Sequence, residues 1–331
     1  MGREKATHIL RPLLVAAAAP YAGLMRLRRA AYHAGIMRRC AAGVPVICVG
    51  NITCGGTGKT PMVAWVVRLL KGAGRKPAIL TRGYKAVEGR SDEAELLADL
   101  ASVPVVVNAD RAAGAKQAVA GGADALVMDD GFQHMRLRRD LDIVLIDATD
   151  PFGGGLLPAG LRREPLSALR DAGAVVITRS NEIAKERLEK LKTRVSRLAP
   201  AATVHAAVHK PVAVIDEGGG RRSASALDGR GVLAFCGIGN AGSFFATLER
   251  LGARLAGRRA LGDHVHYTAR IIESLARAAE DARAELLVTT QKDFVKLRGA
   301  SFGRPVWQLA VEIEVVEGPS ALAEAVLAAV K

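Results

Sequence analysis

A glycine-rich segment near residue 50 constrains this chain more than any other part of the sequence. Residues 46–60 read VICVGNITCGGTGKT, an apolar run followed by glycines and then Gly-Lys-Thr. The apolar run is typical of a buried strand, and the glycines allow backbone N–H groups to turn towards phosphate oxygens at the start of a helix. In such a loop, Lys59 reaches the β- and γ-phosphates and the Thr60 hydroxyl binds Mg²⁺. The segment therefore predicts a site for a nucleoside triphosphate.

One position departs from the full phosphate-binding pattern. That pattern has glycine five residues before Gly58, where this chain has Thr53. An ordinary glycine-rich turn between a strand and a helix is the alternative interpretation. The predicted nucleotide-binding residues are Thr53, Cys54, Gly55, Gly56, Thr57, Gly58, Lys59 and Thr60.

Length and composition indicate a globular protein of about two domains. The chain has 331 residues, and domains usually have about 100–200. The four cysteines form no C-x-x-C pair, so neither a disulfide framework nor a structural metal is indicated, and a reducing cytosol fits. The formal net charge of +14 favours an anionic partner, such as nucleic acid, an acidic membrane surface or a phosphorylated substrate. A basic surface without a specific partner is the alternative.

The N-terminal region, residues 1–35, predicts a helix at a membrane interface. Its uncharged stretch, residues 12–25, is shorter than the roughly 20 residues that span a bilayer, and Pro20 interrupts it. The start resembles a secretory signal, but cleavage there would export the nucleotide site to a compartment without ATP. Apolar residues in the acyl boundary, with Arg26 and Arg28 on anionic head groups, fit an interfacial helix. A helix buried in the protein is the alternative.

Short β-branched runs alternate with helical segments from residue 36 to residue 200. The expected strands are residues 44–50, 77–81, 103–107, 125–129, 143–147 and 175–178, and the helices between them include residues 61–71, 92–100 and 111–120. This alternation predicts a parallel sheet with helices on both faces, an α/β fold of the P-loop NTPase type. Ligands of such sheets bind beyond the carboxyl ends of the strands, where the glycine-rich loop begins.

A second, smaller α/β domain is expected over residues 201–331. A Lys/Arg-rich helix precedes it, over about residues 184–198, and residues 203–215 are expected to form an extended hairpin that leads into it. Its expected strands are residues 231–236, 286–290 and 306–309.

Two adjacent carboxylates follow the strand expected at residues 125–129. P-loop enzymes hold Mg²⁺ at the end of such a strand, opposite the hydroxyl of the loop. Asp129 and Asp130 are therefore the predicted metal ligands, together with Thr60. A neighbouring strand ends in a single carboxylate, Asp147, which is the rival.

Two acid-containing pairs are candidates for proton transfer. Asp92 and Glu93 open an expected helix, where acids often serve only to interact with the helix dipole. Asp263 and His264 lie in an expected turn, where such a pair is often only a local contact. A carboxylate with a histidine partner can also accept the proton of a substrate hydroxyl during phosphoryl transfer. Because the pairs fall in different predicted domains, catalysis through both would require domain closure.

Two arginines are candidates for phosphate binding. Arg111 begins an expected helix, and Arg163 follows a Gly/Pro-rich loop. A guanidinium can bind phosphate through two parallel hydrogen bonds, which lysine cannot do. A solvated surface position is the alternative for each.

Several short motifs, taken together, resemble one enzyme family. They are GNITCGGTGKTP at 50–61, TRGY at 81–84, Asp92-Glu93, DDGFQH at 129–134, LPAG at 157–160, REP at 163–165, Asp263-His264 and TTQKD at 289–293. None of them is specific alone. Their combination resembles the tetraacyldisaccharide 4'-kinases, the lipid A 4'-kinase family, over nearly the whole chain.

The resemblance implies an enzyme that uses ATP and Mg²⁺, with residues 36–200 as its P-loop kinase domain. It would transfer the γ-phosphate to the 4'-hydroxyl of a tetraacylated glucosamine disaccharide 1-phosphate in lipid A biosynthesis. It would lie peripherally on the cytoplasmic face of the bacterial inner membrane. Its partners there would be the anionic membrane surface and its lipid substrate. Neither nucleic acid nor an obligate protein partner is implied.

The resemblance also implies roles for single residues. Asp92 would be the general base, oriented by His264, and Lys59 would act on the transferring phosphate. The residues near the phosphates or the metal would be Glu93, Arg111, Gln133 and Arg163. The second histidine of the family motif is shifted by one residue, to His266, and Gln291 stands in place of a glutamate, so neither is given a role.

A P-loop ATPase or GTPase switch, which acts through nucleotide-dependent association, is the alternative from a different class. Its glycine-rich loop would look much the same. However, residues 178–181, TRSN, are only distantly similar to a guanine-binding motif. The chain also lacks an aromatic and basic stripe on which bases could stack.

Overall fold

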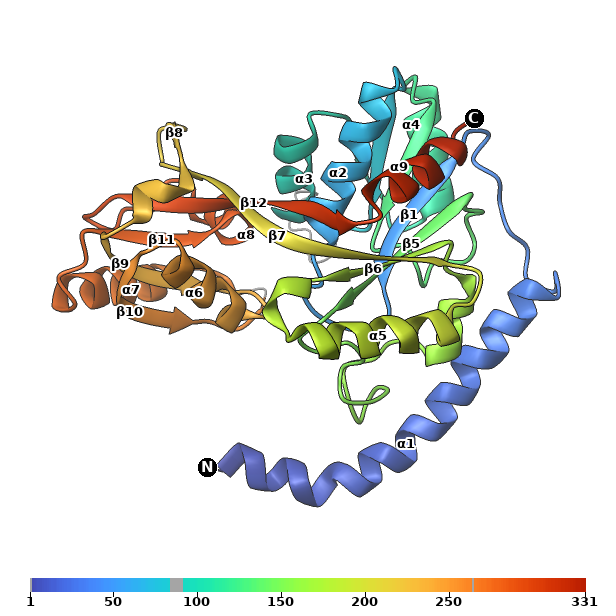
Figure 1. The fold of residues 1–331 in the computed structure, drawn as a ribbon, viewed down its shortest axis with the longest axis horizontal. Helices are drawn as coiled ribbons and strands as arrows, with labels where there is room; N and C mark the ends of the chain where they lie inside the picture. The colour runs from blue at the N-terminus through green and yellow to red at the C-terminus, as the bar shows by residue number, and fades with distance from the viewer. Residues whose placement is uncertain (1, 84–91, 264) are drawn as a thin grey trace. The chain divides into compact units, whose positions relative to one another are not determined.

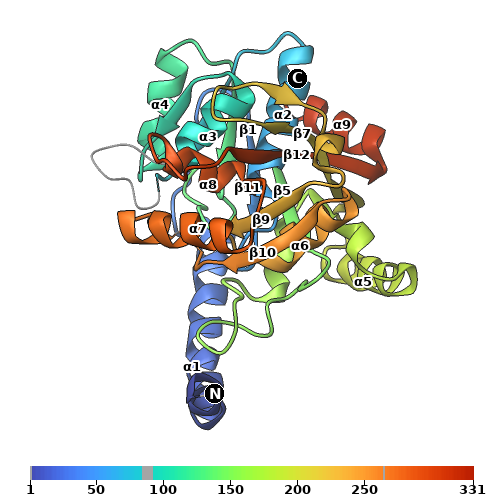
Figure 2. The same ribbon diagram turned by 90° about the vertical axis from the view of Figure 1, so that its left-hand side faces the viewer.

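The computed structural model describes residues 2–83, 92–263 and 265–331, with side chains from residue 12 onwards. The chain divides into two compact units, and both can be followed in two views of the ribbon (Figure 1, Figure 2). The first unit comprises Met1–Lys85, Leu100–Val208 and Glu314–Lys331, and the second comprises Ala86–Asp99 and His209–Ile313. Each unit is therefore assembled from segments that lie far apart in the sequence.

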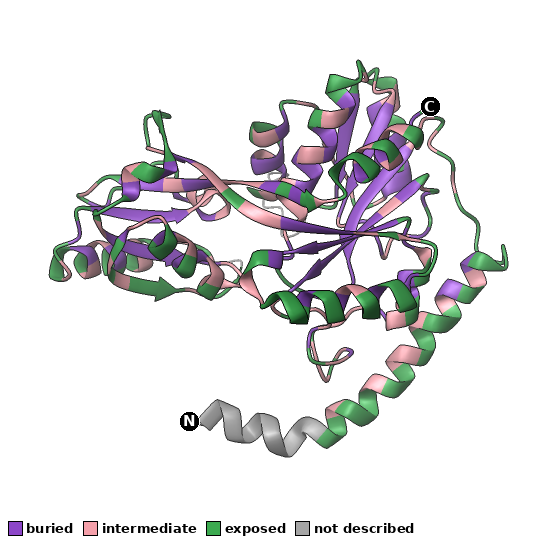
Figure 3. Cartoon of the chain, in the orientation of Figure 1, coloured by how far each residue is buried: buried purple, intermediate pink, exposed green. Residues whose placement is uncertain are grey.

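The first unit is built on a parallel sheet with the strand order β7-β6-β5-β1-β4-β2-β3. The strands are β1 (Val46–Asn51), β2 (Pro77–Thr81), β3 (Val105–Val107), β4 (Ala125–Asp129), β5 (Leu141–Asp147), β6 (Ala174–Thr178) and β7 (Thr203–Ile215). Every residue of β1, β4 and β6 is buried (Figure 3). Near-continuous apolar runs are typical of parallel strands that are covered on both faces.

The first unit contains helices as well as this sheet. They are α1 (Gly2–His33), α2 (Lys59–Gly72), α4 (Arg111–Ala120), α5 (Lys185–Leu198) and α9 (Pro319–Ala328), with short 3₁₀ turns η1 (Leu166–Asp171) and η2 (Ser180–Glu182). In α5, Leu188, Leu191 and Val195 recur every three to four residues and are buried. They join a core cluster that includes Cys48 of β1 and Met128 of β4.

The second unit has its own parallel strands and two buried clusters. Its strand order is β10-β9-β11-β12, with β9 (Gly231–Cys236), β10 (Arg254–Ala260), β11 (Leu286–Thr290) and β12 (Val306–Glu317). Its helical elements are most of α3 (Asp92–Ala101), then η3 (Ala224–Leu227), α6 (Ala241–Arg250), α7 (Ala269–Asp281), α8 (Gln291–Phe294) and η4 (Val295–Leu297). Ala234 packs with Phe244 of α6, whereas its neighbour Phe235 packs with Leu275 of α7. Successive side chains of a strand point to opposite faces, so α6 and α7 cover opposite faces of these strands.

Two long strands, β7 and β12, contribute residues to both units. Residues 203–215, which were expected to form a hairpin, form the single strand β7. The reversal lies beyond it, where Asp216 accepts hydrogen bonds from the N–H groups of Gly218 and Gly220, and β8 (Arg221–Arg222) pairs antiparallel with β7. Pro211 lies within β7 and removes only one N–H from the strand, so it does not force a turn. A tight turn uses the conformational freedom of glycine, which the following segment supplies.

The N-terminal helix α1 has 32 residues and runs through Pro12 and Pro20. Leu13, Leu24 and Leu27 on this helix are 68%, 58% and 69% exposed. Within the described residues, no helix combines the length and the apolar character that a membrane crossing requires.

Candidate active site

The glycine-rich loop connects β1 to α2, as the sequence predicts. Gly55 and Gly58 have φ angles of 120° and 90°, a left-handed region that side chains other than glycine adopt only with strain. Gly58 directly precedes α2, so Lys59 and Thr60 occupy the first turn of that helix. The loop therefore ends at the positive pole of a helix, where backbone N–H groups favour an anion.

Side chains from neighbouring strands fix the shape of this loop. Asn51 donates its side-chain N–H to Thr57 Oγ1 at 2.9 Å, and Thr178 Oγ1 donates to the Thr57 carbonyl at 2.9 Å. Arg179, which follows β6, donates to the Gly56 carbonyl at 2.9 Å and forms an ion pair with Asp147. Asp147 thus supports the loop through Arg179. This structural role explains the presence of Asp147, which the sequence analysis considered as an alternative metal ligand.

Three charged side chains meet at the mouth of the loop. Arg163 donates two hydrogen bonds to the Asp130 carboxylate, at 3.0 and 2.7 Å, and also bonds the side chain of Asn51. Lys59 Nζ lies 3.7 Å from the same carboxylate. Burial alone would raise the pKa of Asp130, but Lys59 and Arg163 outweigh it and lower this pKa to about 2. The carboxylate is therefore ionised at physiological pH and neutralises part of the charge of both cations.

The second carboxylate, Asp129, ends β4 and is 6% exposed. Arg111 is also buried, and it donates to the main-chain carbonyls of Asn108 at 2.8 Å and Asp129 at 3.3 Å. Burial lowers the pKa of Arg111, and the nearby carboxylates of Asp129 and Asp130 oppose that shift. Arg111 therefore bonds the main chain at the end of β4 and is not a solvated surface arginine.

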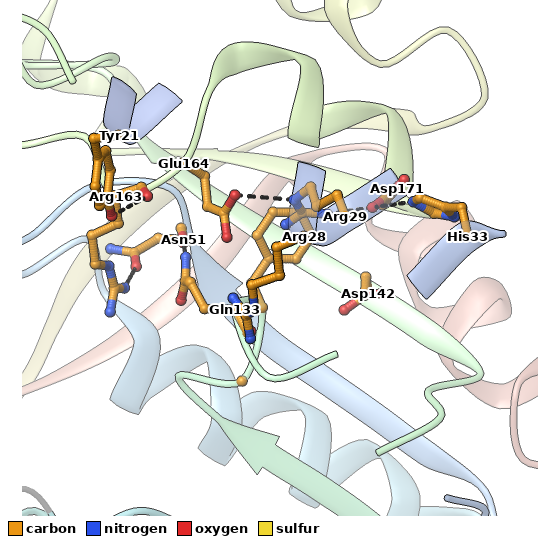
Figure 4. Close-up of polar contacts among 12 residues, drawn as sticks. Tyr21, Arg28, Arg29, His33, Asn51, Gln133, Asp142, Arg163, Glu164 and Asp171 are labelled. Carbon is orange, nitrogen blue, oxygen red and sulfur yellow. Dashed lines mark hydrogen bonds and ion pairs between the residues drawn. The ribbon is translucent and has the colours of Figure 1, made fainter. Parts of the chain in front are cut away.

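The turn after β4 lies against the end of β1. A Cβ atom at Gly50 would be 2.6 Å from the Cβ atom of Phe132, so the approach of these two segments requires glycine. It allows Gln133 Nε2 to donate to the main-chain carbonyl of Asn51 at 2.8 Å. Gln133 and Arg163 thus both contact Asn51, one at its backbone and one at its side chain (Figure 4).

A second group of predicted residues belongs to the second unit. Glu93 of α3 and Asp263 each have a carboxylate oxygen 3.4 Å from Nζ of Lys292. Lys292 lies in α8 beside Asp293, which is completely buried and accepts a hydrogen bond from the N–H of Gly237 at 2.9 Å. The buried neighbour fixes the start of α8, and Lys292 joins the two acid-containing motifs.

The sequence also singled out Asp92, His264 and Gln291 in this unit. Asp92, the first residue of α3, is exposed. His264, its predicted partner, lies outside the described residues. Gln291 accepts a hydrogen bond from the N–H of Val311 at 3.2 Å, which gives this position a structural contact with β12.

Comparisons with known proteins were made with this geometry in hand. Residues 10–331 match the model of the family described as tetraacyldisaccharide-1-P 4'-kinase, LpxK. The chain belongs to this family. Among its relatives, the tetraacyldisaccharide 4'-kinase of Anaeromyxobacter sp. (strain K) is 42% identical, over 96% of this chain and 90% of the relative. That of Geobacter metallireducens is 39% identical, over 86% of this chain and 88% of the relative.

A solved structure of the family has the same fold. The crystal structure of LpxK from Aquifex aeolicus, described as an "apo" form in complex with ATP, is 28% identical with a TM-score of 0.77. The match covers 97% of this chain and 100% of the Aquifex chain. The predicted family and the α/β fold of the P-loop type are therefore confirmed, and the switch-protein alternative is not favoured.

The structure brings together most of the site residues predicted in the first unit. Lys59 and Arg163 both contact Asp130, and Gln133 is joined to Arg163 through Asn51. The sequence interpretation missed the residues that hold these groups in place. They are Asn51 and Arg179, and in the second unit the sequence interpretation also missed Lys292, which contacts Glu93 and Asp263. Asn51 and Lys292 stand inside motifs that were recognised, so their positions carried a signal, but their partners lie far away in the sequence.

Proposed function

We propose that this kinase transfers the γ-phosphate of ATP to the 4'-hydroxyl of a tetraacylated glucosamine disaccharide 1-phosphate, as in lipid A biosynthesis. Membership in the family supports the reaction. The observation that carries the proposal is the cluster of Lys59, Arg163 and Asp130 at the glycine-rich loop. Two fixed cations beside a helix N-terminus favour a polyanion such as a triphosphate.

The residues from Thr53 to Thr60 would hold the nucleotide phosphates. Lys59 and Arg163 would stabilise the negative charge that shifts between phosphate oxygens during transfer, because they are already oriented by Asp130. Asn51, which bonds both Thr57 and Arg163, ties the loop to this arginine. The phosphates of ATP would therefore bind Lys59 and Arg163 with little rearrangement of these side chains.

The oxygen atoms near the loop also fit Mg²⁺. This ion prefers oxygen ligands and is commonly held by one or two carboxylates together with substrate phosphates and water. A carboxyl with a pKa of about 2, such as that of Asp130, supplies a charged oxygen at any physiological pH. Thr60, Asp129 and Asp130 are the residues that would hold the ion. Bound Mg²⁺ would neutralise charge on the phosphate oxygens.

Asp92 is the proposed general base. It would accept the proton of the 4'-hydroxyl as the phosphoryl group is transferred, and His264 would orient it. The ion pairs of Lys292 with Glu93 and Asp263 support this proposal, since they join the motifs that carry Asp92 and His264.

We further propose that the protein lies peripherally on the cytoplasmic face of a bacterial inner membrane. The exposed leucines of α1 would enter the acyl boundary, and Arg26 would contact anionic head groups. The net charge of +14 suits an anionic surface and a phosphorylated lipid. The proposal includes no nucleic acid and no obligate protein partner.

The test is incubation of the purified protein with [γ-³²P]ATP, Mg²⁺ and lipid A disaccharide 1-phosphate. We expect a labelled lipid product that is lost, by roughly a hundredfold or more, in Lys59→Ala, because a cation on the transferring phosphate is removed. Lys116→Ala, an exposed lysine of α4, is the matched control and should retain activity. ATP hydrolysis without labelled lipid would contradict the proposed acceptor.

A further inference from the structure

A buried arginine in the C-terminal half of α1 contacts other segments of the first unit. Arg29 is 6% exposed, although much of the helix around it faces solvent. Its Nε donates to Glu164 at 3.0 Å, its Nη1 forms an ion pair with Asp171, and its guanidinium lies 4.7 Å from the centre of the Phe132 ring. His33, one turn later, is also within 3.1 Å of Asp171 (Figure 4).

Two of the residues that Arg29 contacts are chain neighbours of nucleotide-site residues. Glu164 follows Arg163, and Phe132 precedes Gln133. Two further bonds from α1 reach the same segments: Tyr21 donates to the main-chain carbonyl of Arg163 at 2.9 Å, and Arg28 donates to that of Gln133 at 2.8 Å. In Figure 4, Asn51 lies between Arg163 with Tyr21 on one side and Gln133 with Arg28 on the other.

The same two segments turn their side chains towards the nucleotide site. Arg163 bonds Asp130 and the Asn51 side chain, and Gln133 bonds the Asn51 backbone. One face of each segment is therefore held by α1, while the other shapes the mouth of the glycine-rich loop. The position of the Arg163 side chain therefore depends on the contacts with α1 as well as on those with Asp130 and Asn51.

Loss of Arg29 would act on this arrangement through Glu164. That side chain is 1% exposed, and a buried carboxylate that loses its ion pair either takes up a proton or moves towards water. Arg163 is joined to it by one peptide bond. A shift of Glu164 would therefore displace the guanidinium that contacts Asp130.

We propose that Arg29 is a positioning residue for the ATP phosphates, so that α1 forms part of the nucleotide site in addition to any role at a membrane. The proposal rests on the proposed function, because it assumes that ATP binds at Lys59 and Arg163. It assigns to α1 an effect on ATP affinity that exists without lipid.

The test is the dissociation constant for Mg-ATP, measured by calorimetry in the absence of lipid and membranes. Arg29→Gln should weaken ATP binding roughly tenfold, the effect expected for one impaired charge-assisted contact. Arg38→Gln removes the same charge from an exposed position beyond α1 and should leave the affinity unchanged. In kinetic assays, the KM for ATP should rise while the KM for a detergent-solubilised lipid acceptor stays constant.

A destabilised control separates positioning from general loss of structure. Val195→Ala, in the buried face of α5, should lower the unfolding temperature without changing ATP affinity. Tyr21→Phe removes only the hydroxyl that bonds the Arg163 carbonyl, and it should weaken ATP binding in the same direction even if Arg29→Gln does not fold. Equal ATP affinity in the unaltered protein, Arg29→Gln and Tyr21→Phe would overturn the inference, as would an equal loss in Val195→Ala. Absence of ATP binding in the unaltered protein would instead overturn the proposed function.

Discussion

Asp130 has a φ angle of 49°, the left-handed backbone conformation that costs most residues roughly 1–2 kcal/mol. Aspartate and asparagine adopt this conformation more readily than other side chains. The conformation comes directly after β4, and the carboxylate there meets Lys59 and Arg163. Backbone strain and ion pairs at one residue thus combine to set the positions of both cations.

Asp130→Asn separates the backbone preference from the charge. Asparagine tolerates the same conformation, so the fold should persist and the unfolding temperature should change little. Without the carboxylate, Lys59 and Arg163 lose their shared partner, and kcat should fall roughly 10²–10³-fold. Steady-state kinetics and thermal unfolding of the same preparation measure the two effects.

The control for this substitution is Asp281→Asn, an exposed acid in the last turn of α7. It should leave kcat unchanged. Normal turnover in Asp130→Asn would remove the assigned role of the carboxylate.

The residues of the glycine-rich loop were predictable because their signal is local. Strand, glycines, lysine and threonine follow one another within residues 46–60, and their order alone specifies the phosphate cradle. Arg179 supports the same loop, but its bond to Gly56 spans 123 positions of the chain. No local pattern distinguishes such an arginine from one at the surface.

Among the elements, the buried strands were predicted best. The expected ranges 77–81 and 125–129 coincide with β2 and β4, because parallel strands covered on both faces appear as short apolar runs. By contrast, β10 was missed, because its sequence RLAGRRA is arginine-rich. This strand lies at the edge of the sheet, and most of its residues are exposed. Pairing with β9, and not its own composition, makes this segment a strand.

At the scale of elements, α8 joins α3 to the Asp263 turn through Lys292. Lys292→Gln should lower kcat roughly tenfold with little change in the KM for ATP, because it separates the two motifs that we assign to proton transfer. Lys292→Arg keeps the charge and should restore part of the activity. The kcat and KM values of both variants give the comparison.

The matched control is Lys190→Gln, an exposed lysine of α5 in the first unit. A fall in kcat of the same size there, or an unchanged kcat in Lys292→Gln, would contradict the linking role of Lys292.

At the scale of the whole molecule, the net charge of +14 and the exposed leucines of α1 would act together. Leu24→Ser with Leu27→Ser should weaken sedimentation with vesicles that contain anionic lipid, since each change removes apolar surface from the acyl boundary. Binding of the unaltered protein should also fall as salt rises, because charges are screened beyond about 10 Å at 0.1 M ionic strength. Vesicle sedimentation at low and high salt measures both effects.

Val316→Ser is the control for these leucines. Val316 is 49% exposed in β12, so it tests whether any exposed apolar residue contributes. Unchanged sedimentation of the double leucine variant would exclude α1 as the membrane-binding element.

The first unit contains residues from both ends of the chain, which affects when this unit can finish folding during synthesis. All the strands of its sheet have been synthesised once β7 is made, yet residues 314–331, which supply α9, come after the whole second unit. Leu322 and Val326 of α9 are completely buried, and α9 packs against α2, the helix that begins at Lys59. On the ribosome, the nucleotide-binding unit therefore waits, with part of its apolar surface in water, until the second unit has been synthesised.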